Sequence, residues 1–221
     1  MKDYGILCRE SPVANRIVNK ILSGFVLVAV LTLFSHGFLD ASISSFFYEL
    51  IRANELAPVV SNIPDLLFYI VAAVTAGSWM GYRYRIRLGF DDNHARFLKL
   101  CGTAAPLAFL AKMIFQFLFG RSTPELWAVY HQAPQFHWFR AGDGYGCFPS
   151  GHMTVFTALT VALWRHYPRH RIAYLGFLLA LAFALVATNH HFLSDVIAGA
   201  YLGAVVCFVA DRAVGSPRER V

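Results

Sequence analysis

The chain has 221 residues, of which 57% are hydrophobic and 14% are charged, and its formal net charge is +6. An ordinary soluble domain carries about 25% charged residues, and a soluble chain of this size could not bury so much apolar surface. The composition excludes a disordered chain, a collagen, a coiled coil and a small disulfide-stabilised scaffold. With a mean hydropathy of +0.50, it indicates an integral membrane protein.

Six apolar stretches approach the length of about 20 residues that a helix needs to cross a bilayer. In chain order they are residues 21–39, about 63–82, 98–120, 151–164, 172–188 and 192–210. These spans leave little chain for anything else. We therefore expect one all-α domain over residues 1–221, folded as a bundle of six transmembrane helices.

The placement of the 19 Lys and Arg residues predicts the orientation through the positive-inside rule. With the N-terminus in the cytoplasm, fifteen of them lie on the inner side, and only Arg52, Lys112, Arg121 and Arg140 lie towards the outer side. Both termini are therefore expected in the cytoplasm. This asymmetry and the anionic inner leaflet account for the positive charge, so no nucleic-acid partner is expected.

Three short segments at the outer ends of the predicted spans hold the chemically active side chains: residues 112–124, 147–152 and 189–195. The second contains Pro-Ser-Gly-His at the start of a helix, where free backbone N–H groups and the helix dipole favour an anion. Gly151 permits close approach, and the Ser150 hydroxyl adds a donor. Lys112 and Arg121 add positive charge suited to phosphate.

His191 and Asp195 are four residues apart and so share one helix face. A carboxylate on one ring nitrogen fixes the tautomer and leaves the other nitrogen free to attack or to accept a proton. His152 supplies a second histidine for acid–base chemistry. Each pattern alone has a structural explanation: a helix cap for Pro-Ser-Gly-His, a snorkelling side chain for Lys112, and a surface hydrogen bond for the His–Asp pair. The coincidence of the three patterns at one membrane depth favours a catalytic site.

These residues resemble the type 2 phosphatidic acid phosphatase (PAP2) superfamily of lipid phosphate phosphatases. Its signature combines a Lys followed by Arg-Pro, then Pro-Ser-Gly-His, then Ser-Arg with a downstream His-x-x-x-Asp. The second motif at residues 149–152 and the final His191–Asp195 pair are intact, and the resemblance covers about residues 98–210. It implies a protein of the bacterial inner membrane whose active site lies at the outer, periplasmic interface.

The resemblance also implies a role for each matching residue. His191 would be the nucleophile that forms a phosphohistidine, Asp195 would orient it, and His152 would protonate the leaving oxygen. The phosphate would be bound by Lys112, Arg121, Ser150 and Gly151. The substrate would be a phosphomonoester or pyrophosphate of a membrane lipid. The family needs no metal, and the sequence shows no C-x-x-C motif, so no metal or other cofactor is expected.

The sequence departs from the family signature at two arginines. Arg121 follows Lys112 by nine residues, whereas the usual spacing is seven, and the third-motif Arg would fall at position 185, which is Leu. We expect Arg140, Asn189 or His190 to compensate in part.

Other functions remain open at this point. The same phosphohistidine could pass phosphate to another lipid, which would make the protein a phosphotransferase. The missing arginine could mark an impaired enzyme, and a non-enzymatic transporter or scaffold would not need His191.

Overall fold

The computed structural model describes residues 12–53, 66–130, 136–140, 142 and 144–215, and they confirm the prediction of an all-α protein. Regular structure in this part of the chain is helical, and β-pairing is limited to isolated bridges in the loop after residue 119. The elements are α1 (Pro12–Phe34), η1 (Ser35–Leu39), α2 (Asp40–Ala53), α4 (Leu66–Arg87), α5 (Asn93–Phe119), α6 (Pro124–Tyr130), α7 (Gly151–His166), η2 (Pro168–His170), α8 (Arg171–Ala187) and α9 (Leu193–Ala213).

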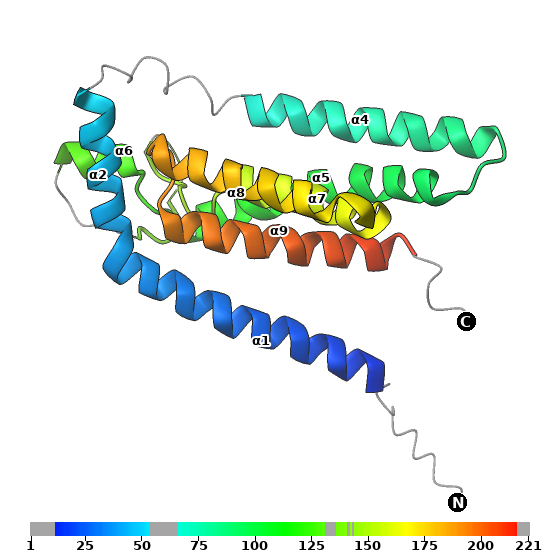
Figure 1. Ribbon diagram of the computed structural model, residues 1–221, viewed down its shortest axis with the longest axis horizontal. Coiled ribbons are helices and arrows are strands. Elements are labelled where there is room, and N and C mark those ends of the chain that lie inside the picture. The colour runs from blue at the N-terminus through cyan, green and yellow to red at the C-terminus, as the bar shows by residue number, and fades with distance from the viewer. Residues whose placement is uncertain (1–11, 54–65, 131–135, 141, 143, 216–221) are drawn as a thin grey trace, which may run out of the picture.

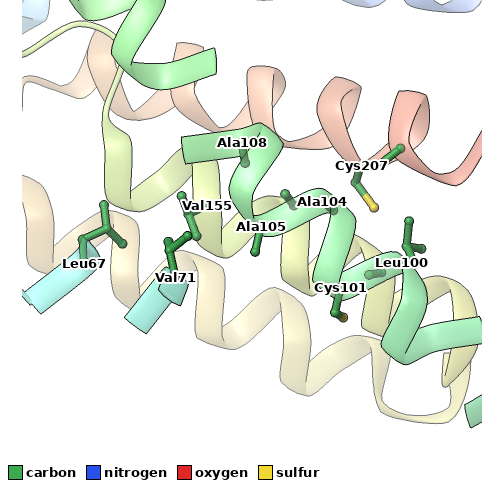
Figure 2. Close-up of a cluster of buried hydrophobic side chains, with 12 residues drawn as sticks. Leu67, Val71, Leu100, Cys101, Ala104, Ala105, Ala108, Val155 and Cys207 are labelled. Carbon is green, nitrogen blue, oxygen red and sulfur yellow. The ribbon is translucent and has the colours of Figure 1, made fainter. Parts of the chain in front are cut away.

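Helices α5, α7 and α9 form the centre of the bundle, with α4 packed on α5 and α8 packed on α7 (Figure 1). The contacts between these helices are lined by small buried side chains, many of them alanine. One cluster joins Ala104, Ala105 and Ala108 of α5 to Val155 of α7 and to Leu67 of α4, as Figure 2 shows. Small residues let helix backbones approach closely, which is how helices associate in a bilayer.

Large apolar side chains point outward instead. Phe38, Met80 and Ile172 each expose more than two thirds of their surface, and exposed large apolar residues occur on most of the long helices. Four helical segments are long and apolar enough to cross a membrane: Val18–Ala53, Asn93–Phe119, Pro168–Ala187 and Leu193–Ala213. An apolar exterior around a core of small residues is the arrangement expected of a protein surrounded by lipid.

The predicted spans overlap α1 with η1, α4, α5, α7, α8 and α9. The helix ends lie within about five residues of the expected positions, except that α1 begins at Pro12, well before the expected start at residue 21. Residues 63–65, where the second span was expected to begin, lie outside the described residues. Helix α7 has only 16 residues. Neither α4 nor α7 is among the four segments that meet the length and hydropathy requirements for a span.

Helix α2 was not predicted. The chain continues from α1 through the five-residue π-helix η1 and then turns, so that α2 runs across one end of the bundle (Figure 1). π-Helical turns occur often at functional sites. Helix α2 contacts α6, α8 and α9, at the end of the bundle where α7 and α9 begin and α5 ends.

Candidate active site

A cavity of about 460 Å³ opens at this end of the bundle and collects residues from several helices and the loops between them. Lys112 and Gln116 come from α5, Gly151 and His152 from the first turn of α7, and His191 from the turn before α9. Other lining residues include Tyr48, Ile51, Leu67, Thr123, Glu125, Tyr145, Gly146, Cys147, Thr188, Asn189 and His190. The structure thus brings the three predicted segments to one site.

The first turn of α7 is held so that its backbone faces Lys112. Ser150 caps the helix by accepting a hydrogen bond from the Met153 N–H (3.4 Å), and its own N–H donates to the Asp195 carbonyl (3.0 Å). Gly151 leaves room for Lys112, since a Cβ there would lie 2.8 Å from Lys112 Cδ. Ser150 itself is fully buried and is not among the cavity residues, so its hydroxyl serves the helix cap in this structure.

His152 and His191 face each other across the site, with ring centroids 6.4 Å apart. The two ring planes are inclined by 66° and both rings line the cavity, so a phosphate bound there can contact both. The helix dipole, the free N–H groups of α7 and the Lys112 ammonium all favour an anion at this place. The arrangement can therefore bind a phosphate within reach of both histidines.

The His191–Asp195 pair contains a third member that the sequence analysis did not identify. His191 Nδ1 lies 3.8 Å from Asp195 Oδ2, beyond hydrogen-bond distance, and Cys147 Sγ lies between them, 3.2 Å from Nδ1 and 3.0 Å from Oδ2. Burial, followed by the neighbouring Asp195 carboxylate, raises the pKa of the Cys147 thiol well above its usual value. The neutral thiol can accept from Nδ1–H and donate to the carboxylate, and so connect the two.

Arg121 is fully buried and is not among the cavity residues, although it was expected to bind phosphate. Its guanidinium binds Asp195 Oδ1 through Nη1 and Asp40 Oδ2 through Nη2, the latter at 2.7 Å. Burial disfavours the Arg121 cation, but the carboxylates of Asp195 and Asp40 outweigh this effect and raise its pKa. In this structure Arg121 positions Asp195.

Asp40, at the start of α2, was missed by the sequence analysis. It is 1% exposed, and its carboxylate accepts hydrogen bonds from Arg121, from the Ser194 N–H (3.0 Å) and hydroxyl (2.5 Å), and from the Ser35 hydroxyl (2.9 Å). The sequence did contain a signal for Asp40, because it is an acidic residue directly after an apolar segment. A buried charge near a membrane is costly, so such a residue indicates that the fold supplies it with a specific partner.

The expected compensating residues lie in different places. Asn189 and His190 line the cavity; the Asn189 side-chain oxygen accepts from Ser44 Oγ (2.6 Å), and His190 Nδ1 lies 2.9 Å from Thr188 Oγ1. Arg140 is not a cavity residue and stacks on the Tyr145 ring at 3.8 Å. Leu185 packs in an apolar cluster with Met153 and Val196, so no cation stands at that position.

Comparisons with known proteins find similar membrane and lipid phosphatases. Lipid A 1-phosphatase from Rhizobium johnstonii is 34% identical over 87 residues, which is 38% of this chain and 34% of that protein, so the match spans about a third of the relative's length. The fold is similar to the crystal structure of a transmembrane PAP2-type phosphatidylglycerolphosphate phosphatase from Bacillus subtilis. The TM-score is 0.51 at 19% identity, covering 90% of this chain and 99% of that one.

The fold and the apolar helices together support a multi-pass membrane protein. The PAP2 superfamily model matches residues 97–216, which hold all the motif residues discussed above. The chain belongs to the PAP2 superfamily.

Proposed function

We propose that the protein is a membrane lipid phosphatase that hydrolyses a phosphomonoester or pyrophosphate of a lipid through a phosphohistidine. The observation that carries the proposal is the convergence of His152, His191 and Lys112 on one cavity at the N-terminus of α7. The superfamily membership and the similarity to a lipid A 1-phosphatase support the substrate class.

In the proposed reaction, His191 Nε2 attacks phosphorus while Nδ1 faces Cys147 and Asp195. His152, on the other side of the phosphate, protonates the leaving oxygen and then takes a proton from the water that hydrolyses the phosphohistidine. Lys112 and the N–H groups of α7 stabilise the phosphate charge, and no step requires a metal ion. Arg121 acts on the phosphate only through Asp195.

The proposal includes the setting of this chemistry. Residues 1–221 would form one membrane domain with six spans, in a bacterial inner membrane. The basic residues would lie in the cytoplasm, and the cavity would open at the periplasmic interface, where the phosphate of a membrane lipid can reach it.

The test is phosphate release by purified protein in detergent with EDTA present. The substrates are phosphatidic acid, phosphatidylglycerol phosphate, lipid A and undecaprenyl pyrophosphate. Wild type and the control His170→Ala, altered at the opposite end of the bundle, should release phosphate. His191→Ala should lose at least about a thousandfold in rate, because it removes the nucleophile.

Three results would contradict the proposal. Activity that EDTA abolishes would exclude a metal-independent mechanism, and His191→Ala with wild-type activity would exclude the phosphohistidine. Transfer of phosphate to a second lipid without free phosphate would identify a phosphotransferase.

A further inference from the structure

Cys147, His191 and Asp195 present three different ligand atoms at one point. Sγ of Cys147 lies 3.2 Å from His191 Nδ1 and 3.0 Å from Asp195 Oδ2, and Nδ1 and Oδ2 are 3.8 Å apart. All three atoms lie within 4.8 Å of one another. A thiolate, an imidazole nitrogen and a carboxylate oxygen are the ligands that zinc takes in proteins.

We propose that this triad binds a zinc-type divalent cation, and that the bound ion inhibits the enzyme. The inhibition rests on the function proposed above, whereas the binding does not. In tetrahedral zinc sites, bonds of about 2.0–2.3 Å place neighbouring ligand atoms about 3.3–3.6 Å apart. Two of the observed separations, 3.0 and 3.2 Å, are below this range, and the third, 3.8 Å, is above it. Shifts of a few tenths of an ångström would therefore bring the three atoms to three of the four coordination positions.

The surroundings of the triad suit a cation. Cys147 and His191 both line the cavity, which gives the ion an entry path and leaves the fourth position for water or a phosphate oxygen. Asp195 is held by Arg121 on Oδ1 and by the Phe192 N–H on Oδ2 (2.9 Å). Such outer contacts orient the ligands of protein metal sites.

The charges of the occupied site also balance. The thiolate and the Asp195 carboxylate together neutralise a divalent ion, while the Arg121 cation is neutralised by Asp40. Sulfur and imidazole ligands favour zinc over Mg²⁺, which prefers oxygen ligands.

Occupancy would remove the nucleophile by changing the tautomer of His191. An ion on Nδ1 moves the imidazole proton to Nε2, so the lone pair that would attack phosphorus is no longer free. The Cys147 thiol loses its proton to solvent, since a coordinated thiol is deprotonated. One proton is therefore released for each ion bound.

Binding is tested without substrate by adding Co²⁺, as a coloured substitute for zinc, to EDTA-treated and desalted protein in detergent. Wild type should show a thiolate-to-cobalt charge-transfer band in the near ultraviolet, which Zn²⁺ should displace. Cys147→Ser should lose the band. Cys101→Ser, which alters a buried thiol in the core of α5, should keep it. No band in wild type, or an unchanged band in Cys147→Ser, overturns the proposal.

Inhibition is tested by titrating Zn²⁺ into the phosphate-release assay. Zn²⁺ should inhibit wild type and Cys101→Ser, EDTA should restore the rate, and Mg²⁺ should have no such effect. Cys147→Ser lacks one ligand, so the Zn²⁺ concentration that inhibits it should be at least about tenfold higher than for wild type. Inhibition of each variant is measured relative to its own uninhibited rate. Equal sensitivity of the two variants overturns the inhibition. A protein that binds Co²⁺ through Cys147 but releases no phosphate contradicts the proposed function and leaves the metal site supported.

Discussion

At the scale of single residues, Asp40 and Arg121 determine how Asp195, beside the proposed nucleophile His191, is held. Asp195 receives the Arg121 guanidinium on one oxygen, and Asp40 holds the same guanidinium from the other side. Asp40, Arg121 and Asp195 are thus connected in series, and Cys147 connects Asp195 to His191. A change at the first should therefore act on the rate through the last.

We predict that Asp40→Asn lowers kcat about 10- to 100-fold and changes KM little. Charge-assisted hydrogen bonds contribute about 1.5–3 kcal/mol, and each 1.4 kcal/mol corresponds to a factor of ten in rate. The matched control is Asp211→Asn, which removes a carboxylate paired with Arg165 (2.6 Å) at the other end of α9. Steady-state kinetics separate the two constants. An equal fall of kcat in both variants would assign Asp40 a role in folding alone.

Cys147 gives a second prediction at this scale, based on its raised pKa. Because the thiolate is the form that reacts, folded protein should resist N-ethylmaleimide at Cys147 between pH 7 and 8, and unfolded protein should react readily. The folded state keeps the thiol proton, whereas an unfolded cysteine loses it near pH 8.5. The contribution of the Cys147 thiol to the free energy of unfolding is therefore fully present below that pH and decreases as the pH rises above it.

The measurement is peptide mass spectrometry of the labelled protein with and without denaturant. Rapid labelling of Cys147 in folded protein at pH 7 would contradict the buried, protonated thiol.

At the scale of elements, the position of the two motifs depends on the close contact of α7 with α9. A Cβ added to Gly199 of α9 would lie 2.7 Å from the Ser150 carbonyl oxygen and 3.2 Å from Met153 Cβ. A residue larger than glycine at position 199 would therefore push α7 and α9 apart. Since Ser150 caps the first turn of α7 and Gly199 follows Asp195 on α9, separating the helices would move the two halves of the site apart.

Gly199→Ala should therefore destabilise the protein by about 1–3 kcal/mol, the usual cost of overpacking. Gly176→Ala is the matched control on α8, because its added Cβ meets nothing within 4 Å. That variant should be neutral or slightly more stable, as alanine is the better helix former. Unfolding in detergent, followed by circular dichroism, measures both. A Gly199→Ala protein as stable as the control would show that α7 and α9 are not closely packed.

The sequence predicted those parts of the structure that depend on local pattern. Apolar stretches indicated α5, α8 and α9, and the topology argument placed Lys112, His152 and His191 at one membrane depth. Helix α2 was missed because Asp40 ends the apolar stretch and the residues after it are more polar.

The contacts that were missed are long-range. Cys147 is 48 residues from Asp195, and Arg121 is 81 residues from Asp40. No spacing rule for one helix or one loop reveals such pairs, since they form only when the bundle is assembled. Arg121 binds the carboxylates of Asp40 and Asp195, which are distant from it in the sequence. Its spacing from Lys112 therefore did not indicate its partners.

At the scale of the whole molecule, the two ends of the bundle differ in chemistry. The helix starts of α7 and α9 lie at one end, and the turn between α4 and α5 lies at the other (Figure 1). The cavity is lined by residues of the first end. At that second end, Arg85 pairs with Asp92 (2.5 Å), and Lys99 donates to the Val214 carbonyl (3.1 Å). Basic residues of this end include Arg83, Arg85, Arg87, Arg96, Lys99, Arg165, Arg169, Arg171 and Arg212. The positive-inside rule assigns such an end to the cytoplasm.

This orientation predicts which engineered thiols a membrane-impermeant maleimide reaches in spheroplasts. In a Cys8→Ser background, Trp138→Cys, at an exposed position of the loop near the cavity, should be labelled from outside. Asp91→Cys, exposed in the turn between α4 and α5, should be labelled only after lysis. Labelling of Asp91→Cys alone from outside would invert the orientation. Labelling of both would mean that α5, which connects the two positions, does not cross the membrane, because a crossing helix must place its two ends in different compartments.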